Sequence, residues 1–554
     1  MKKGQKKHSP KFIFVSGGVI SGIGKGITTA SIAAILKSKG YKVSPIKVDM
    51  YLNQDAGTIR PQEHGEVFVT LDGIETDQDV GHYERFIDEA IRRTNYITTG
   101  QIYAEVLRAE RAFEYRGEDV EAIPHVTDEI IRRFYIAAKG YDICIIELGG
   151  TVGEYQNAIF FEAARILRLR HPHDVIHIHV AYLPIPAYLG EMKSKPVQQS
   201  VRTLNSMGIQ PDVIVGRSEV TIDDRRKERV ALFCNVDKKA VLSNPDVLSI
   251  YEVPVILEKQ QAGEIVLEKL GLRPKKRDLN LWRNLVRKIK NLKKEVNIAV
   301  VGKYFGVGSF QLSDVYVSVI ESLKHAAWAN NVNVKLHWID AERIESEGAG
   351  RILEKFDGIV VPGGFGKRGT EGMIKTIKFA RENKIPYLGL CYGMQMATIE
   401  FARHVAGLKN ANTTEIDDDN PHPIIHIMPD QEKKLLRREY GGTMRLGGWE
   451  CIIKRGTVTE QAYLKAGRIK KNGRAKIVER HRHRYEFNNK YRQPLEKAGM
   501  VIAGTTPDGR LVEIIELAGH PFFVGTQFHP EFQSRPLAPH PLFAGFIKAS
   551  IKTQ

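Results

Sequence analysis

The sequence predicts an α/β protein made of two doubly wound parallel-sheet domains. A short apolar run ends in paired glycines before a helical pattern in "KFIFVSGGVISGIGKGITTASIAAILKSKG", residues 11–40. Strand and helix patterns then alternate, and the alternation restarts at "EVNIAVVGKY" after a basic helical stretch. At 554 residues the chain is too long for one core, so several domains are expected.

Composition is that of a globular protein, with 42% hydrophobic and 27% charged residues. No apolar run has the length needed to span a bilayer, and the basic N-terminus "MKKGQKKHSPK" lacks the apolar stretch of a secretion signal. The cysteines are far apart and form no Cys-x-x-Cys pair, which favours a reducing cytoplasm over a structural zinc site. They are Cys144, Cys234, Cys391 and Cys451.

The net charge of +17 predicts anionic partners, either nucleic acid or polyphosphate metabolites. No nucleic-acid module is visible in the most basic stretch, "RPKKRDLNLWRNLVRKIKNLKK". Its apolar residues fall at helical spacing and predict an amphipathic linker helix with a solvated charged face. These residues are Leu279, Trp282, Leu285, Val286, Ile289 and Leu292. The predicted division is residues 1–275, a linker at 276–295, and residues 296–554.

The first glycine-rich turn, Val15 to Leu36, resembles a phosphate-binding loop but departs from the usual pattern. Gly24-Lys25 is present, yet five residues separate it from Gly18, and Gly26 stands where a Mg²⁺-binding hydroxyl is usual. A strand, a glycine turn and a helix N-terminus would present backbone N–H groups to an anion. The alternative is a tight turn with a solvated lysine. A nucleotide site here requires acidic metal ligands elsewhere.

Candidate metal ligands follow later strands. "YDICIIELGG" predicts a buried strand that delivers Glu147 at its carboxyl end, the edge at which open α/β sheets gather ligands. A short polar stretch, "DGIETDQDVG", offers Asp72, Glu75, Asp77 and Asp79. For the first three we expect an exposed loop with ordinary solvation. Lys47 follows another predicted strand and would suit a site that holds several phosphates.

The most specific signal is "IPYLGLCYGMQ", in which Gly389-x-Cys391-x-Gly393 lies between a strand and a helix. This predicts a nucleophile elbow with cysteine in place of serine, and the helix N-terminus favours thiolate. "FVGTQFHPEFQS" places His529 and Glu531 two residues apart, as a base and its orienting acid. Glycines in "GIVVPGGFGKRG" could stabilise an oxyanion. The alternative is a buried structural cysteine with an unrelated surface histidine.

Two further stretches concentrate basic side chains. "ERHRHRYE" holds Arg480, Arg482 and Arg484, which could receive a carboxylate near the thiol. In "DVIHIHVAYLP", His177 and His179 alternate along a predicted strand and share a face, and we interpret them as ordinary strand residues.

Taken together, these stretches resemble the CTP synthase family over nearly the whole chain. The match is carried by "SGGVISGIGKGI", "HGEVFVTLDGIETDQDVGHYERF", "IELGGTVGE", "GEMKSKPVQQSV", "ALFCNV", "GGTMRLG", "ERHRHRYE" and "QFHPEF". The resemblance implies a P-loop-type amidoligase followed by a class I glutamine amidotransferase. It implies CTP formation from UTP, ATP and glutamine with Mg²⁺, feedback inhibition by CTP, activation by GTP and a cytoplasmic homotetramer.

Alternatives remain at this point. Another glutamine-fed P-loop ligase, similar to cobyric acid synthase, is one, although "GEMKSKPVQQSV" favours a pyrimidine nucleotide. A nucleic-acid-binding protein with relic folds is another, and the Cys-His-Glu set argues against it. Neither nucleic acid nor a membrane is an expected partner.

The resemblance also implies site residues at matching positions. For ATP these are Gly22, Ile23, Gly24, Lys25, Gly26, Ile27, Asp79, Asp246 and Val247, with Lys25 and Lys47 on phosphates and Asp79 and Glu147 on Mg²⁺. For UTP and CTP they are Ser21, Glu154, Tyr155, Gln156, Lys193, Ser194, Lys195, Pro196, Val197, Gln198 and Arg229. For glutamine they are Gly364, Tyr392, Gln395, Glu415 and Arg482. The catalytic set is Cys391, His529 and Glu531, with the N–H groups of Gly364 and Tyr392 as the oxyanion hole.

Two positions depart from the family pattern. Glu154-Tyr155-Gln156 stands where Asp-Ile-Glu is usual, which predicts weaker CTP inhibition. Pro245 stands where a basic residue usually precedes Asp-Val, which puts the adenine contact in question.

Two more segments match regulatory or transport features of the family. "GGTMRLG", with Arg445, matches the segment linked to GTP activation. "RPQEHGEVF", with His64 and Val67, matches the segment that lines the ammonia passage.

Overall fold

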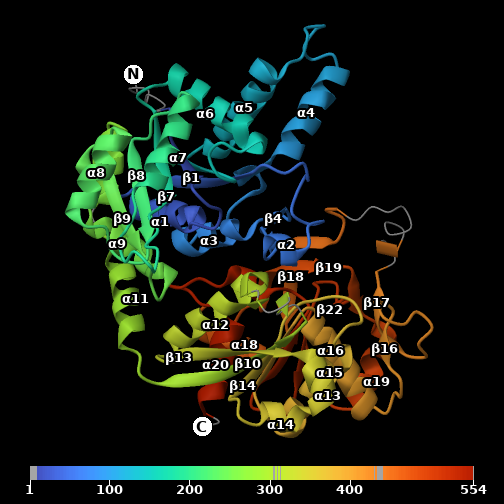
Figure 1. The fold of residues 1–554 in the computed structure, drawn as a ribbon. Coiled ribbons are helices and arrows are strands. Elements are labelled where there is room, and N and C mark those ends of the chain that lie inside the picture. The colour runs from blue at the N-terminus through green and yellow to red at the C-terminus, as the bar shows by residue number, and fades with distance from the viewer. Residues whose placement is uncertain are drawn as a thin grey trace. The chain divides into compact units, whose positions relative to one another are not determined.

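The computed structural model describes residues 9–276, 278–303, 306–307, 310–311, 313–428, 431–432 and 441–552. The chain forms two compact units (Figure 1). The first comprises Met1–Asp55 and Asp79–Val286, and the second comprises Ala56–Gln78 and Arg287–Gln554. The segment 56–78 therefore belongs with the C-terminal part of the chain, a grouping that the division predicted from sequence does not contain.

The first unit is built on a seven-stranded sheet in which every pairing is parallel. In spatial order the strands are β5 (Tyr96–Thr98), β2 (Val43–Asp49), β6 (Ile143–Leu148), β1 (Lys11–Gly18), β7 (Val175–Tyr182), β8 (Val213–Ser218) and β9 (Val241–Pro245). This confirms the predicted doubly wound sheet. The carboxyl ends of β1, β2 and β6 lie side by side and deliver the glycine turn, Lys47 and Glu147 to one edge.

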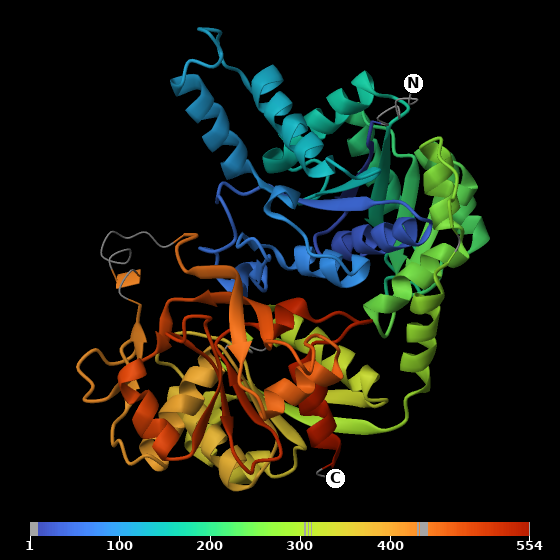
Figure 2. The same ribbon diagram turned by 180° about the vertical axis from the view of Figure 1, so that it is seen from behind.

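Helices cover both faces of this sheet (Figures 1 and 2). They are α1 (Lys25–Ser38), α3 (Gln78–Ile87), α4 (Thr99–Arg111), α5 (Thr127–Ala138), α6 (Ala158–Arg170), α7 (Lys195–Ser206), α8 (Asp224–Cys234), α9 (Val253–Lys259) and α10 (Ala262–Lys269). The α1 helix is buried along most of its length, and its apolar residues Ile32, Ile35 and Leu36 all lie inside. On the opposite side, Phe12 and Phe14 of β1 share a core with α5 and α6.

The predicted amphipathic linker is present as α11 (Asn280–Asn291). Its buried residues are Trp282, Leu285 and Val286, while its basic side chains Arg283 and Arg287 are exposed. The Trp282 ring lies 5.2 Å from that of Phe86 in α3, so the start of the helix packs on the first unit.

The second unit contains a nine-stranded sheet. In spatial order the strands are β13 (Asn333–Asp340), β10 (Glu295–Gly302), β14 (Gly358–Val361), β15 (Tyr387–Leu390), β23 (Phe523–Thr526), β22 (Val512–Leu517), β21 (Met500–Thr505), β18 (Arg445–Ile453) and β19 (Lys476–His483). The strands from β13 to β23 pair in parallel, as predicted, and the others pair antiparallel. The turn "TPDGR" joins β21 to β22 directly, and such a short connection requires antiparallel strands.

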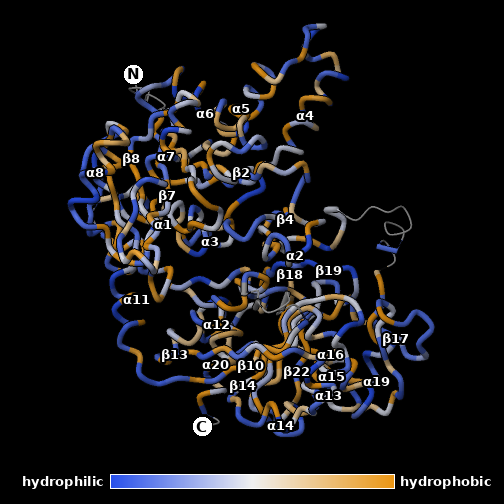
Figure 3. Tube along the Cα trace, viewed as in Figure 1, coloured by the Kyte–Doolittle hydropathy of each residue, from blue (hydrophilic) through white to orange (hydrophobic). Residues whose placement is uncertain are grey.

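Eight further helices and a three-stranded sheet belong to the described part of this unit. The helices are α12 (Val317–Ala329), α13 (Ala341–Glu347), α14 (Ala349–Leu353), α15 (Thr370–Glu382), α16 (Tyr392–His404), α18 (Val458–Lys465), α19 (Arg492–Lys497) and α20 (Pro541–Lys552). The small sheet joins β16 (Asn412–Thr413), β17 (Pro423–Ile427) and β20 (Tyr485–Phe487). Hydrophobic residues concentrate along the central strands (Figure 3). Among the described residues, no helix has both the length and the apolarity to cross a membrane.

The segment 56–78 folds as α2 (Pro61–His64) and a hairpin of β3 (Phe68–Val69) and β4 (Glu75–Thr76). The Gly448 N–H donates to the Leu71 carbonyl over 2.8 Å, which ties the hairpin to β18. A Cβ on Gly447 would come within 2.7 Å of the Gly73 backbone, so only glycine permits this approach. Long-range contacts of this kind place the segment in the second unit.

The expectation of an exposed acidic loop is confirmed for Asp72 and wrong for Glu75 and Asp77, which are 1% and 6% exposed. Glu75 accepts from the Arg482 guanidinium of β19 at 2.8 Å, and Asp77 lies 3.0 Å from the His64 ring. The error arose because Arg482 is distant in sequence, so local polarity gave no sign of a buried partner.

Candidate active sites

The glycine turn of the first unit carries Lys25 at the start of α1. Gly24, just before the helix, has a left-handed backbone (φ 83°). The Lys25 ammonium donates to the Gly150 carbonyl at 2.7 Å. A Cβ on Gly17 would lie 2.7 Å from Cδ of Lys25, so that glycine lets the lysine side chain lie against the loop.

Gly26 explains the irregular loop. A Cβ at this position would fall 1.9 Å from Oδ1 of Asp79. The Asp79 carboxylate thus takes the space beside the helix start that a serine or threonine side chain fills in the usual pattern. Position 26 therefore lacks a hydroxyl side chain because the Asp79 carboxylate occupies the space that this side chain would need.

Lys47 joins the two predicted metal ligands. It is paired in register with Glu147 on the neighbouring strand, so their side chains share one face of the sheet. Its ammonium lies 3.3 Å from Glu147 and 2.5 Å from Asp79. Tyr83 of α3 donates to the second Glu147 oxygen. The two carboxylates are therefore close enough to share one cation.

Burial and charge shape this cluster. Burial lowers the pKa of Lys25, and the nearby Lys47 ammonium lowers it further, although Glu147 and Asp79 act in the opposite direction. Burial, together with the Glu147 carboxylate, raises the pKa of Tyr83 well above its usual value, which keeps it a hydrogen-bond donor. Two carboxylate donors match the preference of Mg²⁺ for hard oxygen ligands, so the residues fit that ion.

Apart from the segment 154–156, the predicted pyrimidine-nucleotide residues are found in three places in the first unit. Lys193 and Ser194 precede α7, and Lys195 to Gln198 form its first turn. The Lys193 ammonium pairs with Glu191 at 2.7 Å. Ser21 is exposed in the glycine turn, and Arg229 is exposed on α8.

The segment 154–156, which differs from the family pattern, has a local structural role. Glu154 accepts from both the Thr151 N–H (2.7 Å) and the Thr151 hydroxyl (2.6 Å), which shapes the loop that also receives Lys25. Tyr155 is 94% exposed. Its ring is therefore available to a ligand.

Arg217 is a residue that the sequence analysis missed. Its guanidinium donates to Asp246 at 2.8 Å and to the Pro245 carbonyl at 2.9 Å. It also approaches Gly24 of the phosphate-binding turn. The family's basic residue is absent at position 245, but Arg217 brings a cation to the same place. Arg217 lies near the carboxyl end of β8, the edge at which open α/β sheets gather ligands.

In the second unit, Cys391 occupies the turn between β15 and α16. Its φ of 49° is a strained value for a residue with a side chain, as expected of a nucleophile elbow. A Cβ on Gly389 would lie 2.6 Å from the Tyr387 hydroxyl oxygen, and one on Gly393 would lie 2.1 Å from the Val361 carbonyl oxygen. Both glycines of the motif are thus required by close packing.

His529 and Glu531 form the expected pair. Nδ1 of His529 lies 2.7 Å from the Glu531 carboxylate, and both residues are buried. Burial lowers the pKa of His529, but the charges of Glu531 and of a Cys391 thiolate outweigh it and raise that pKa to about 10. A Cβ on Gly363 would lie 2.9 Å from Cε1 of His529, so the glycine loop borders the same site. At neutral pH this arrangement therefore keeps the His529 imidazole protonated beside Cys391.

The loop after β14 is held from both sides at Gly366. Its N–H donates to Glu415 at 2.6 Å, and its carbonyl accepts from the Tyr392 hydroxyl at 2.7 Å. Lys303 donates to the Phe365 carbonyl at 3.0 Å and to the Gly366 carbonyl, and burial lowers its pKa to about 8. Burial also raises the pKa of Glu415. Sequence reasoning did not identify Lys303, which lies beyond the end of β10.

Two of the predicted glutamine residues, Gln395 and Arg482, already have partners in the protein. Gln395 donates to the Tyr485 carbonyl at 3.1 Å. Gln527, which the sequence analysis did not identify, lies with its amide nitrogen 3.7 Å from the Cys391 sulfur. Arg482 already bonds Glu75, so any substrate carboxylate would share its guanidinium with that residue.

His177 and His179 share a face as predicted, and both bond the Ser16 hydroxyl at 2.8 Å inside the first unit. Burial lowers the pKa of His179 to about 3. They are therefore neutral core residues.

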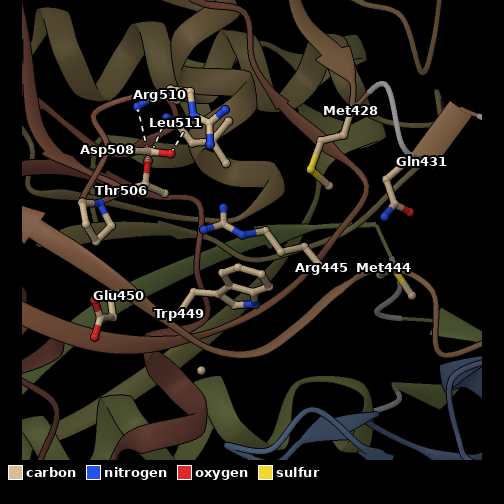
Figure 4. Close-up of a pocket in the computed structure, with 12 residues that line it drawn as sticks. Met428, Gln431, Met444, Arg445, Trp449, Glu450, Thr506, Asp508, Arg510 and Leu511 are labelled. Atoms are coloured by element: carbon tan, nitrogen blue, oxygen red, sulfur yellow. Dashed lines mark hydrogen bonds and ion pairs between the residues drawn. The ribbon is translucent and has the colours of Figure 1, made fainter.

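A cavity of about 790 Å³ lies beside β18 (Figure 4). Arg445 and Trp449 line it, and the guanidinium carbon lies 4.9 Å from the Trp449 ring. Arg445 also donates to Glu486 at 3.0 Å and to Glu513 at 2.7 Å. Because Glu486 follows Tyr485, which binds Gln395, the cavity wall connects to the predicted glutamine residues.

The fold and the two sites define a class, a P-loop-type amidoligase joined to a class I glutamine amidotransferase. Comparison agrees: residues 11–272 match the family model described as CTP synthase N-terminus, and residues 311–549 match that of glutamine amidotransferase class-I. The chain belongs to the CTP synthase family, and it is an ATP-dependent ligase.

Individual relatives cover nearly the whole chain. A CTP synthase of Carboxydothermus hydrogenoformans is 52% identical over 98% of this chain and 99% of its own length. One from Methanocaldococcus jannaschii is 49% identical over 98% of each. A solved Trypanosoma brucei CTPS glutaminase domain with bound acivicin is 37% identical over 46% of this chain and 94% of its own, with a TM-score of 0.42.

Proposed function

We propose that the chain aminates UTP at C4 to give CTP, using ATP and ammonia released from glutamine, as the last step of de novo CTP synthesis. The uracil O4 is a poor leaving group, and its phosphorylation creates an imidate phosphate that ammonia displaces. The observation that carries the proposal is the presence in one chain of the buried Cys391–His529–Glu531 set and the Lys25–Lys47–Asp79–Glu147 cluster. The alternative of another glutamine-fed ligase, similar to cobyric acid synthase, is not favoured, since relatives named CTP synthase match 98% of the chain.

The first unit would perform the phosphoryl transfer. Lys25 and Lys47 would contact phosphates, and the turn from Gly22 to Ile27 would cradle them with backbone N–H groups. Asp79 and Glu147 would hold Mg²⁺, which offsets charge on the transferred phosphoryl group when bound. Lys47 now bridges these two carboxylates and would be free to turn toward phosphate once they have another cation.

The adenine side of ATP would lie toward Asp246 and Val247, with Arg217 supplying the cation that Pro245 lacks. UTP, and CTP as inhibitor, would lie against Ser21, the start of α7 and Arg229. The segment 154–156 would touch the cytidine of bound CTP.

The second unit would release ammonia. The Cys391 thiolate would attack the glutamine amide, and protonated His529 would give its proton to the departing ammonia. Glu531 would hold that imidazole in place through its 2.7 Å bond. The N–H groups of Gly364 and Tyr392 would bind the oxyanion. Gln395, Glu415 and Arg482 would hold the rest of glutamine.

Partners and regulation follow from the same family membership. GTP would activate through the segment around Arg445, and His64 and Val67 would line the ammonia route. We expect a cytoplasmic homotetramer with no nucleic-acid or membrane partner. The +17 charge would then serve anionic nucleotides.

Two single variants test the proposal as a pair. Cys391→Ala should end CTP formation from glutamine and leave formation from ammonium salt largely intact, because the phosphate site is untouched. Lys25→Ala should end both, because UTP is never phosphorylated. Glutamine-dependent synthesis in Cys391→Ala would refute the amidotransferase assignment. Full ammonia-dependent synthesis in Lys25→Ala would show that the opening loop is only a turn.

A further inference from the structure

A stack of buried rings connects the 56–78 segment to the catalytic histidine. Phe68 in β3 is fully buried and meets the Phe532 ring edge-on, with ring centroids 5.1 Å apart. Phe532 in turn lies nearly parallel to the His529 imidazole, with centroids 5.1 Å apart and an interplanar angle of 17°. One ring therefore separates Phe68 from His529.

Arg480 makes a second connection between the same partners. Its guanidinium donates to the Val69 carbonyl at 3.0 Å and lies 5.4 Å from the centre of the Phe68 ring. Its own carbonyl accepts from the His529 N–H at 2.8 Å. Arg480 is 1% exposed, so its position is fixed by these contacts.

The backbone of Glu531, whose carboxylate holds His529, is also connected to the 56–78 segment. Glu66 accepts from the Ser318 N–H near the start of α12 at 3.0 Å. One turn later, the Ser322 hydroxyl contacts both the Ser318 carbonyl (2.6 Å) and the Glu531 carbonyl (3.2 Å). Glu66 and Phe68 are two residues apart in the same segment. Glu66 is connected to Glu531 through the first turn of α12, and Phe68 is connected to His529 through the Phe532 ring.

The orientation of the imidazole depends on this packing. The His529 imidazole is held at Nδ1 by the Glu531 carboxylate and interacts with Cys391. Bonds in the plane of the ring do not fix its tilt, so the Phe532 ring packed against its face sets that angle. Removing Phe68 would open space into which Phe532 could move, and the imidazole would follow.

We propose that Phe68 is a positioning residue for glutamine hydrolysis, which fixes the aim of His529 at the Cys391 thiol through the Phe532 ring. The inference rests on the proposed function, because it assigns glutamine hydrolysis to Cys391. It assigns part of the glutaminase to a segment that lies, in sequence, within the amidoligase half.

The test uses the full chain with Phe68→Ala and the milder Phe68→Leu, which keeps bulk but removes the ring edge. With ATP, UTP and GTP present, the kcat for glutamine hydrolysis should fall about 10- to 100-fold in Phe68→Ala and less in Phe68→Leu. The KM for glutamine and ammonia-dependent CTP synthesis should stay within about twofold. The rate of Cys391 alkylation by iodoacetamide at one fixed pH should also change in Phe68→Ala, because the imidazole would no longer hold its place beside the thiol.

Phe546→Leu is the matched control, since Phe546 is equally buried but lies in α20 and packs on Phe522. It should lower the melting temperature and leave both kinetics and the alkylation rate unchanged. The inference is overturned if both Phe68 variants hydrolyse glutamine like the wild type. Equal loss of glutamine- and ammonia-dependent synthesis in Phe68→Leu would also overturn it, as a general structural role. A wild type that hydrolyses no glutamine would refute the proposed function itself.

Discussion

Restoring a side chain at position 26 should inactivate the first site, although it makes the loop look more conventional. A Cβ there would lie 1.9 Å from Oδ1 and 2.4 Å from Cγ of Asp79. An ordinary contact requires 3.4 Å, so the carboxylate must move by about 1.5 Å, the difference between 3.4 and 1.9 Å. Gly26 is already helical, so backbone strain is not involved.

The size of the effect follows from that displacement. A shift of about 1 Å in a positioned catalytic group costs about 100-fold in rate, or about 2.7 kcal/mol of barrier. Gly26→Ala and Gly26→Ser should therefore lower CTP formation at least about 100-fold with either nitrogen source. Stability should change little, because the displaced atoms are the end of a partly exposed side chain.

The assay compares CTP formation from ammonium salt, CTP formation from glutamine, and glutamine hydrolysis alone. Hydrolysis should persist in the Gly26 variants, since Cys391 lies in the other unit. Gly350→Ala, a helical glycine whose Cβ would make only an ordinary 3.7 Å contact, is the control and should be neutral. Normal ammonia-dependent synthesis in Gly26→Ser would refute the steric reasoning and the role of Asp79.

Two other changes test the thiol site and the regulatory segment. Glu531→Gln should slow glutamine hydrolysis while sparing ammonia-dependent synthesis, and it should lower the pKa of His529 from about 10. Because folding raises the pKa of His529, its protonation stabilises the folded protein fully below about pH 6.5, and this contribution is lost as pH rises through about 10. The difference in melting temperature between wild type and Glu531→Gln should therefore be largest at low pH and shrink as pH rises. Replacing Glu154, Tyr155 and Gln156 by Asp, Ile and Glu should strengthen CTP inhibition with similar turnover at low CTP. Inhibition curves that coincide with the wild type would contradict this role.

Local patterns predicted the features that depend on neighbours in sequence. The strand, turn and helix around Lys25, the elbow at Cys391 and the His529–Glu531 spacing each lie within about ten residues, so their geometry follows from periodicity and glycine placement. The amphipathic α11 was predictable for the same reason.

Features that depend on distant partners were not predictable in this way. Glu75 and Arg482 are far apart in sequence, and nothing in either neighbourhood indicates that they pair inside the second unit. The role of Arg217 likewise depends on its hydrogen bond to Asp246, which directly follows the neighbouring strand β9. The role of Gly26 was visible as an anomaly, but its cause is the carboxylate of Asp79, which tertiary structure alone brings there.

The assignment of residues 56–78 to the second unit also bears on how the gene can be divided. A cut within α11 yields a C-terminal fragment that contains Phe532 and Arg480 but lacks the hairpin that covers them. If the two fragments were expressed separately, activity would require the N-terminal fragment to insert its segment 56–78 into the C-terminal fragment, in addition to binding it. Selection on glutamine hydrolysis would then act on substitutions at Phe68, although this residue lies in the amidoligase half of the sequence. The two halves of the gene would therefore not evolve or recombine independently of one another.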